Sequence, residues 1–285
     1  MKKDSVDILF LGDVAGRPGR KAAAKFIEEL KNCSVSYKYF DKSQEFKQIP
    51  DFIIVNVENA SHGFGLTERN YNEFVNLGID ALTSGNHIWD KKEIFQYVEG
   101  ADRLVRPLNY PKDTPGEGIR VFEKNGLKIG VVNMLGRVFM NPIDSPWSAL
   151  EKAVESLKKE TNIIIVDFHA EATAEKISYG YFADNLGVSA LVGTHTHVQT
   201  ADESILQGGM GYITDVGYCG AYHSIIGMDI ESSVHRLKTG LPERYEVAEM
   251  GLCEVDGLRL LIDSVSGRTE KISRFKYITE VREVN

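Results

Sequence analysis

The sequence has few cysteines, no long apolar run and no excess of positive charge. Its three cysteines, Cys33, Cys219 and Cys253, are an odd number, lie far apart and form no CxxC pair. This argues against a disulfide framework or a cysteine-ligated zinc site and favours reduced thiols. No apolar run approaches the roughly 18 residues of a membrane helix. Residues 1–4 run directly into a strand-like segment without the cleavage site of an export signal. We therefore expect a cytoplasmic protein without a membrane segment.

The charge balance is acidic. The 285 residues include 33 lysines and arginines against 41 aspartates and glutamates, a formal net charge of −8. Such a chain has no general attraction to long nucleic acids or anionic membranes, whereas small phosphorylated ligands are compatible with it. With 42% hydrophobic and 26% charged residues, the composition is that of a globular protein, which excludes the disordered and fibrous classes.

Short β-rich runs alternate with segments of helical period along most of the chain, which is the pattern of an α/β fold. Strands are predicted at residues 6–11, 52–57, 81–83, 119–123, 128–133, 163–168, 190–192 and 211–214. Helices are predicted at residues 17–31, 67–76, 91–98, 146–159 and 173–184. Thr67 is a suitable N-cap, and Pro146 suits the first helical position because its missing N–H is harmless there.

The end of the chain has a different character. Three strands are predicted there, at residues 247–255, 258–265 and 269–278. Asp256-Gly257 and Ser266-Gly267 are expected to join them, because Asp-Gly between β-rich runs favours a hairpin. The sequence therefore predicts a C-terminal antiparallel β-meander over residues 247–278.

No boundary divides the sequence into separate units. It contains no Ser/Pro/Gly-rich linker, internal repeat or low-complexity tract. We therefore predict one domain over residues 1–285, of which the meander is a part. Residues 32–48 are interpreted as a polar surface excursion between the first helix and the second strand.

Polar side chains that can bind metal ions follow five of the predicted strands. In chain order they are Asp13, Glu58, Asn59, Asn86, His87, His169, His195 and His197. Ligands of open α/β sheets bind outside the carboxyl ends of the strands, so five strand ends can converge on one crevice. Taken singly, each residue also fits a turn, a helix cap or a buried imidazole. His195 and His197 are the stronger signal, because residues i and i+2 of an extended chain project to the same side.

The set as a whole has a consistent chemistry. Two carboxylates, two amides and three or four imidazoles, with no thiolate, form an oxygen and nitrogen donor set that suits a pair of Mn²⁺, iron or Zn²⁺ ions. Two such ions about 3.5–4 Å apart, bridged by a carboxylate, stabilise the attacking and leaving oxygens of an in-line phosphoryl displacement. The donor set therefore predicts hydrolysis of a phosphoester.

Five short motifs occur in a fixed order: GD at 12–13, EN at 58–59, GNH at 85–87, His169, and GTHTH at 193–197. This series resembles the calcineurin-like metallophosphoesterase family. Longer strings resemble its bacterial YmdB-like branch: DFHAEAT at 167–173, GTHTHVQTADE at 193–203 and YITDVG at 212–217. The similarity extends from about residue 6 to residue 278.

The resemblance implies a two-sheet β-sandwich core flanked by helices, a two-metal centre, and phosphodiesterase activity on 2′,3′-cyclic or 3′,5′-cyclic nucleotides. In similar proteins, the residues matching Asp13, Glu58, Asn59 and His197 hold one metal ion. Those matching Glu58, Asn86, His169 and His195 hold the other, so that the glutamate bridges both. The match to His87 is the proton donor to the leaving oxygen. Iron or manganese is the expected metal, with zinc as the alternative.

The sequence departs from the wider family at two positions. Ala15 stands where the wider family has a histidine, and Asn59 can take its place at the first metal. Glu58 stands where the wider family has an aspartate, and its longer arm can still reach two ions. Both changes are typical of the YmdB-like branch. The expected mechanism is attack of a metal-bridging hydroxide on phosphorus while His87 protonates the ribose oxygen. Asp90 can orient that imidazole, but it equally fits the first residue of a helix.

Several alternatives stay open. GDVAGRPG at 12–19 can be interpreted as a nucleotide-binding glycine loop, but its spacing is not GxGxxG and the strand-end donors would be unexplained. A phosphomonoesterase, or a metal-binding regulatory or scaffold protein with weak catalysis, would use the same ligands. His62 is near enough to Glu58 in sequence to touch substrate, whereas His223 and His235 are expected at surface or structural positions. The sequence does not identify the native metal or the natural small phosphodiester, and it leaves a homo-oligomer open.

Overall fold

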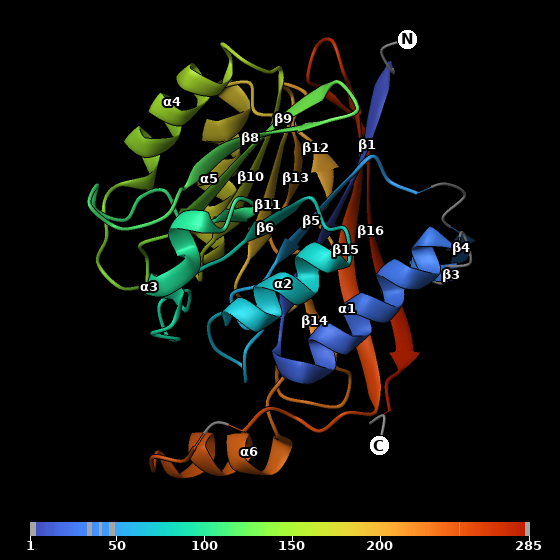
Figure 1. Cartoon of the computed structure of the whole chain (residues 1–285), viewed down its shortest axis with the longest axis vertical. Coiled ribbons are helices and arrows are strands. Elements are labelled where there is room, and N and C mark those ends of the chain that lie inside the picture. The colour runs from blue at the N-terminus through green and yellow to red at the C-terminus, as the bar shows by residue number, and fades with distance from the viewer. Residues whose placement is uncertain (1–3, 33–35, 40–41, 46–48, 245, 283–285) are drawn as a thin grey trace.

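The computed structural model describes residues 4–32, 36–39, 42–45, 49–244 and 246–282. Two β-sheets pack face to face, and helices cover the outer face of each sheet, so that the protein has four layers (Figure 1). This is the helix-flanked, two-sheet β-sandwich that the family resemblance implied. Among the described residues, no helix has both the length and the apolar character that crossing a bilayer requires.

The first sheet carries the N-terminal strands and the C-terminal hairpin. Its main order is β4-β3-β16-β15-β1-β5-β6-β7, with β14 paired to β15 and β2 paired to β14. Strands β1, β5, β6 and β7 are parallel, whereas β15 runs antiparallel to β1 and to β16. The strands are β1 Ser5–Leu11, β2 Asp13–Val14, β3 Ser36–Tyr39, β4 Lys42–Glu45, β5 Phe52–Asn56, β6 Ala81–Thr83, β7 Leu104–Val105, β14 Tyr218–Ala221, β15 Leu252–Asp263 and β16 Thr269–Glu280.

The second sheet has the order β12-β13-β11-β10-β9-β8. Strands β9, β10, β11 and β13 are parallel, and the edge strands β8 and β12 are antiparallel to their neighbours. The carboxyl ends of the parallel strands therefore lie at one edge of the sheet. The strands are β8 Ile119–Lys124, β9 Leu127–Leu135, β10 Ile163–His169, β11 Ala190–Thr194, β12 Ser204–Ile205 and β13 Gly211–Ile213.

Helices α1 and α2 cover the first sheet, and α4 and α5 cover the second (Figure 1). The predicted helix starts at Thr67 and Pro146 are confirmed: Thr67 Oγ1 accepts a hydrogen bond from Asn70 N, and Pro146 is the first residue of α4. The predicted helix over 91–98 is shorter than expected. The helices are α1 Gly16–Lys31, α2 Glu68–Asn76, α3 Ile94–Tyr97, η1 Val98–Gly100 (3-10), α4 Pro146–Leu157, α5 Thr173–Asn185 and α6 Ile230–Thr239.

Alternate residues of the central strands pack into different layers. In β1, Leu9 and Leu11 pack in the cluster that includes α1 and α2, whereas Ile8 and Phe10 pack between the two sheets. A third apolar cluster, which includes Val166 of β10, fills the space between the second sheet and helices α4 and α5. Burial on both faces explains why these strands are continuous apolar runs in the sequence rather than alternating ones.

The predicted turn at Asp256-Gly257 is wrong. Both residues lie inside β15, which pairs with β16 without a break at this point, so the C-terminal strands form one long hairpin and not a three-stranded meander. The glycine serves close packing: a Cβ at Gly257 would lie 2.3 Å from the ring of Phe275. The Asp256 carboxylate is buried 2.8 Å from the ammonium group of Lys276, and burial raises its pKa to about 7.

The second predicted turn, at Ser266-Gly267, is confirmed. It connects β15 to β16, and Gly267 has a φ of +72°, which favours glycine. Ser266 N also donates a hydrogen bond to Asp263 Oδ1 (2.7 Å), which closes the turn.

Several segments differ from the predicted loops. The described parts of the 32–48 excursion contain β3 and β4, which extend the edge of the first sheet, while residues 33–35, 40–41 and 46–48 lie outside the described residues. Residues 218–221, which belong to none of the predicted strands, form β14. Two of the cysteines, Cys219 and Cys253, are buried free thiols, and Cys33 lies outside the described residues.

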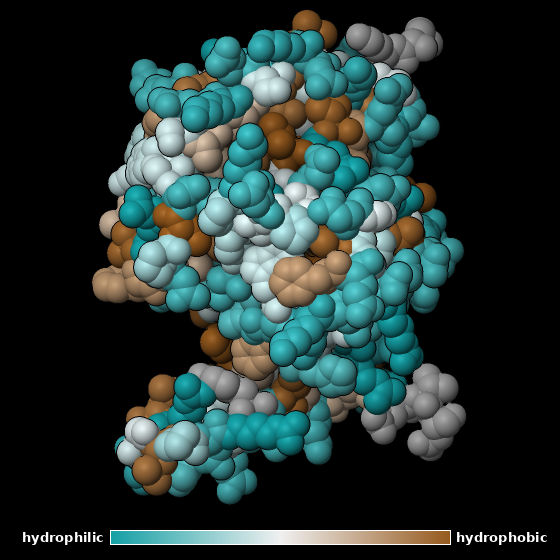
Figure 2. Space-filling model, turned by 60° about the vertical axis from the view of Figure 1, so that its left-hand side comes forward, coloured by the Kyte–Doolittle hydropathy of each residue, from teal (hydrophilic) through white to brown (hydrophobic). Residues whose placement is uncertain are grey.

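Helix α6 is set apart from the body of the protein. The helix lies at the lower end of the molecule in Figure 1. Figure 2 shows hydrophobic residues on the surface of this lower end. Ile230, Val234 and Leu237 of α6 are exposed. None of the predicted helices or strands covers this segment, which contains His235.

Candidate metal centre

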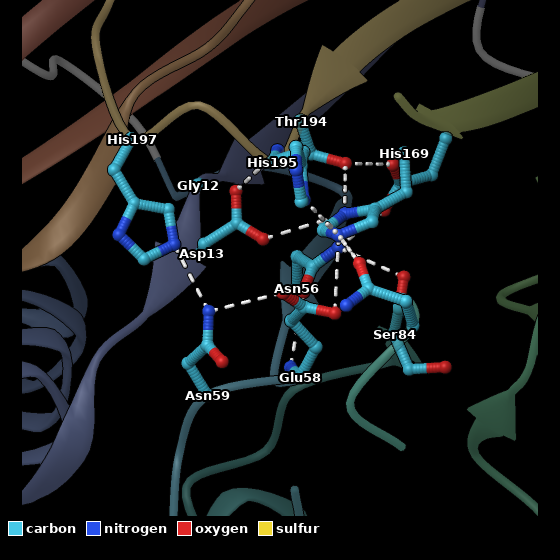
Figure 3. A network of polar contacts seen from close by, with 12 residues as sticks. Gly12, Asp13, Asn56, Glu58, Asn59, Ser84, His169, Thr194, His195 and His197 are labelled. Carbon is cyan, nitrogen blue, oxygen red and sulfur yellow. Dashed lines mark hydrogen bonds and ion pairs between the residues drawn. The ribbon is translucent and has the colours of Figure 1, made fainter. Parts of the chain in front are cut away.

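The candidate ligands lie at the carboxyl ends of strands from both sheets (Figure 3). Asp13 follows β1 and Glu58 follows β5 of the first sheet. His169 is the last residue of β10, and His195 directly follows β11 of the second sheet. Packing of the two sheets therefore brings together residues that are far apart in the sequence, and the hydrogen bond from His195 N to Asp13 Oδ2 (3.1 Å), for example, spans 182 residues.

One ligand group consists of Glu58, His169 and His195, whose ligand atoms lie within 4.8 Å of one another. His169 Nε2 is the central atom of this group, because it lies 3.0 Å from Glu58 Oε2 and 3.0 Å from His195 Nδ1. The amide oxygen of Asn86, Oδ1, lies 3.1 Å from the same nitrogen. Two imidazole nitrogens, a carboxylate oxygen and an amide oxygen thus face one small space. This is a donor set that a first-row divalent ion would accept.

A second ligand group consists of Asp13, Glu58 and His197, again within 4.8 Å. Glu58 belongs to both groups, which is the position of a bridging carboxylate. Asn59 lies beside the second group, with its Nδ2 3.0 Å from His197 Nε2 and 3.0 Å from Glu58 Oε1. Asn59 would offer its oxygen to an ion there only if its amide turned over.

The polar atoms of the second group are incompletely satisfied. Asp13 Oδ1 and Asn59 Oδ1 are buried and make no hydrogen bond to any residue that the structure describes. A buried oxygen without a partner costs about 1–3 kcal/mol, and a bound cation would remove that cost. The chemistry of both groups and the orphaned Asp13 Oδ1 fit a pair of metal ions, and Asn59 Oδ1 would contribute only after its amide turned over.

Burial and charge shift the pKa values of the centre in different directions. Burial, together with the carboxylate of Glu58, raises the pKa of Asp13 well above its usual value. Burial alone would lower the pKa of His169, but the charges of Glu58 and Asp13 outweigh it and raise this pKa to about 9. Burial and His169 lower the pKa of His195 to about 3, and burial lowers that of His197. His195 and His197 are therefore neutral, the form in which histidine binds metal.

The loop that carries His195 and His197 is not extended, contrary to the reasoning that linked the two residues in the sequence. Their φ angles are +104° and +61°, in a region that non-glycine residues rarely adopt and that costs on the order of 1–3 kcal/mol per residue. As a result the two imidazoles serve different groups, His195 with His169 and His197 with Asp13 (Figure 3). His197 Nδ1 is fixed by the carbonyl of Ile226 at 2.8 Å.

His87 lies beside the centre without belonging to either ligand group. Its side chain is 31% exposed, and its Nδ1 lies 2.9 Å from Asp90 Oδ2. Its backbone N–H donates to Glu58 Oε2 (3.3 Å), and the ring of Phe64 contacts it edge-on at 4.9 Å between centroids. The carboxylate of Asp90 is therefore placed to orient the imidazole, as the sequence spacing suggested.

Comparisons with known proteins identify the family. A family model described as YmdB-like protein matches residues 9–275. A relative from Bacillus subtilis (strain 168), described as a 2′,3′-cyclic-nucleotide 2′-phosphodiesterase, is 46% identical over 267 residues, which cover 94% of this chain and 95% of the relative. The chain belongs to the YmdB-like family.

Solved structures resemble this YmdB-like protein over nearly its whole length. A structure from Mycoplasma pneumoniae, described as a novel phosphatase, has a TM-score of 0.84 at 34% identity and covers 96% of this chain and 94% of that one. A calcineurin-like phosphoesterase from Bacillus subtilis is 10% identical, with a TM-score of 0.54 over 97% of this chain and 90% of that one. That likeness shows the fold: it is the calcineurin-like phosphoesterase fold.

The structure explains why this member of the YmdB-like family has Ala15 in place of a histidine. Ala15 is buried at the N-cap of α1, and Gly227 packs so closely that a Cβ there would lie 2.8 Å from the methyl group of Ala15. Gly227 follows Ile226, whose carbonyl holds His197. This packing leaves no room for an imidazole at position 15 on the side of Gly227, and the carbonyl of Asn59 lies next to it, where it accepts a hydrogen bond from Gly16 N (2.9 Å).

A second layer of polar residues, which the sequence did not reveal as functional, supports His169. His169 Nδ1 lies 2.9 Å from Thr194 Oγ1, which donates a hydrogen bond to Asp167 Oδ1 (2.6 Å). Asn56 Nδ2 donates to the other oxygen of Asp167 (2.9 Å). The available signal was Asp167 itself, an acidic residue inside an otherwise apolar buried strand. Such partners fix the orientation of ligand histidines.

The remaining histidines lie outside both ligand groups. His62 is exposed and lines a surface cleft together with Arg17 and Val247. His223 is also exposed, in the segment after β14. His235 on α6 pairs with Glu243.

Gly85 is required by the geometry of the centre. An added Cβ would lie 2.0 Å from Glu58 Oε2 and 2.4 Å from His169 Nε2. We expect Gly85→Ala to displace these two side chains, to weaken Mn²⁺ binding by at least about 10-fold and to lower the free energy of unfolding by about 1–3 kcal/mol. Titration with Mn²⁺ and urea denaturation measure both effects. Gly100→Ala is the control, because its Cβ meets nothing within 4 Å; equal Mn²⁺ affinity in the two variants would contradict the assignment.

Proposed function

We propose that this protein is a dinuclear-metal phosphodiesterase that hydrolyses small phosphodiesters, 2′,3′-cyclic nucleotides in particular. The observation that carries the proposal is the pair of ligand groups that share Glu58, with His87 beside them at the surface. The substrate class is suggested by the 46% identical relative, which is described as a 2′,3′-cyclic-nucleotide 2′-phosphodiesterase.

Two sets of residues would hold the ions. The first set is Asp13, Glu58, Asn59 and His197, and the second is Glu58, Asn86, His169 and His195. When bound, a pair of divalent ions supplies Lewis acidity toward the phosphodiester oxygens and toward water. Oxygen and imidazole donors suit iron or manganese, and they also accept zinc.

His87 is the residue proposed to protonate the leaving oxygen. Only a protonated imidazole can give a proton from Nε2 while Nδ1–H donates to a carboxylate, and the carboxylate of Asp90 lies 2.9 Å from Nδ1 to accept that bond. The partial exposure of the His87 ring lets it reach a substrate. The hydrogen bond from the backbone N–H of His87 to Glu58 Oε2 keeps the residue next to the ligand groups. Hydrolysis of a 2′,3′-cyclic nucleotide at the 2′ oxygen would leave a 3′ phosphate.

A substrate panel tests this proposal. The Mn²⁺-loaded protein is assayed with 2′,3′-cyclic AMP, 3′,5′-cyclic AMP, bis-p-nitrophenyl phosphate and p-nitrophenyl phosphate. We expect turnover of the diesters, highest for the 2′,3′-cyclic nucleotide and with a 3′-phosphate product, and little turnover of the monoester. Preference for the monoester would identify a phosphatase, the description carried by the relative from Mycoplasma pneumoniae. Full metal occupancy with no turnover of any substrate would identify a metal-binding regulatory protein.

A further inference from the structure

A buried ion pair lies outside both ligand groups. Lys176 of α5 and Asp215, which follows β13, are 0% and 1% exposed, and Lys176 Nζ lies 2.7 Å from Asp215 Oδ2. Removing two charges from water is costly, and the attraction within such a pair often fails to repay that cost. A contribution to stability is therefore a weak explanation for this pair, and its contacts point to another.

The pair binds the backbone on both sides of His195. Lys176 Nζ also donates to the carbonyl oxygen of Thr194 (2.7 Å), the residue before His195. Asp215 Oδ2 accepts a hydrogen bond from the N–H of Thr196 (3.0 Å), the residue after it. One ammonium group and one carboxylate thus hold both peptide groups that determine the orientation of His195.

The same carboxylate connects to the Asp13 side of the centre. Asp215 Oδ1 accepts from Gly217 N (3.0 Å), and the carbonyl of Gly217 accepts from Asp13 N (3.3 Å). The loop and the strand that supply the ligands of the second group are therefore tied to one buried carboxylate.

We propose that the Lys176–Asp215 pair is a positioning device that holds the loop of His195 and His197 in its left-handed conformation and so presents the two imidazoles to two different metal ions. The proposal rests on the proposed metal centre. Both charged groups bind the backbone of Thr194 and Thr196 by hydrogen bonds, and neither forms a hydrogen bond or ion pair with a ligand side chain among the described residues. Without the pair, a loop with two non-glycine residues at positive φ has a more favourable extended alternative.

The test uses variants that change the charges but preserve the volume. Lys176→Met leaves a buried, unpaired carboxylate, whereas the double variant Lys176→Met/Asp215→Asn removes both charges and avoids that penalty. Lys124→Met is the control at a more exposed ion pair: Lys124 Nζ also lies 2.7 Å from a carboxylate, that of Asp80, its side chain is 37% exposed, and the pair lies outside the ligand groups. Metal-free proteins are titrated with Mn²⁺ by calorimetry, and amide hydrogen exchange is followed at residues 194–197.

We expect both Lys176 variants to bind Mn²⁺ about 10–100-fold more weakly and to exchange the amide of Thr196 faster, while Lys124→Met stays within about twofold of the parent protein. The double variant carries no unpaired charge, so its Mn²⁺ affinity still tests the proposal if the single variant fails to fold. A double variant that is less stable but binds Mn²⁺ as tightly as the parent would show a merely structural role and overturn the proposal. If the parent protein itself binds no Mn²⁺, the metal centre fails instead.

Discussion

Glu58→Gln is expected to empty the metal centre and abolish turnover. Glu58 belongs to both ligand groups and is 1% exposed, so no solvent replaces its charge. Glutamine keeps the shape of the side chain but removes the negative charge that would lie between two divalent ions. Loss of a residue that only hydrogen-bonds to a metal ligand already lowers metal affinity or activity 10–100-fold, and Glu58 is proposed as a ligand itself. We therefore expect Mn²⁺ affinity and turnover to fall by more than about 100-fold.

Metal analysis after gel filtration and turnover of the 2′,3′-cyclic nucleotide measure these effects. Glu254→Gln is the matched control: Glu254 is 7% exposed and paired with Lys276, and it belongs to neither ligand group. A Glu58→Gln protein that retains two ions per chain and more than a tenth of the parent's turnover would remove Glu58 from the bridging position.

His87→Ala is expected to separate chemistry from metal binding. His87 is in neither ligand group, so the metal content should equal that of the parent protein. Removing a general acid typically costs 10²–10⁴-fold in rate. We expect a loss of that order in kcat for a cyclic nucleotide, whose ribose oxygen leaves poorly without a proton.

The dependence on the leaving group distinguishes an acid from a residue that only binds substrate. With bis-p-nitrophenyl phosphate, whose phenolate leaves without protonation, His87→Ala should lose far less activity than with the cyclic nucleotide. His235→Ala is the control, because His235 lies on α6, pairs with Glu243 and belongs to neither ligand group. Equal losses on the two substrates, or loss of metal, would contradict the role of His87 as proton donor.

Much of the fold was predictable because its signals are local. The apolar runs of β1, β5 and β10, the cap at Thr67 and the proline that begins α4 all appear at the predicted places. The exception at Asp256-Gly257 has a long-range cause. A sequence that suits a tight turn also suits a strand whose glycine lies under the ring of Phe275, and only the pairing of β15 with β16 decides between them.

Local sequence patterns reveal which donors are available, since the chemical types of the donors, their order and their places after strands can be identified residue by residue. They do not show that Asp13 and Glu58 come from one sheet and His169 and His195 from the other. Nor do they show that His195 and His197 turn to different groups, or that Lys176 and Asp215 bind the backbone on both sides of His195. These features depend on contacts between segments far apart in the chain, and such contacts exist only after the two sheets have packed together.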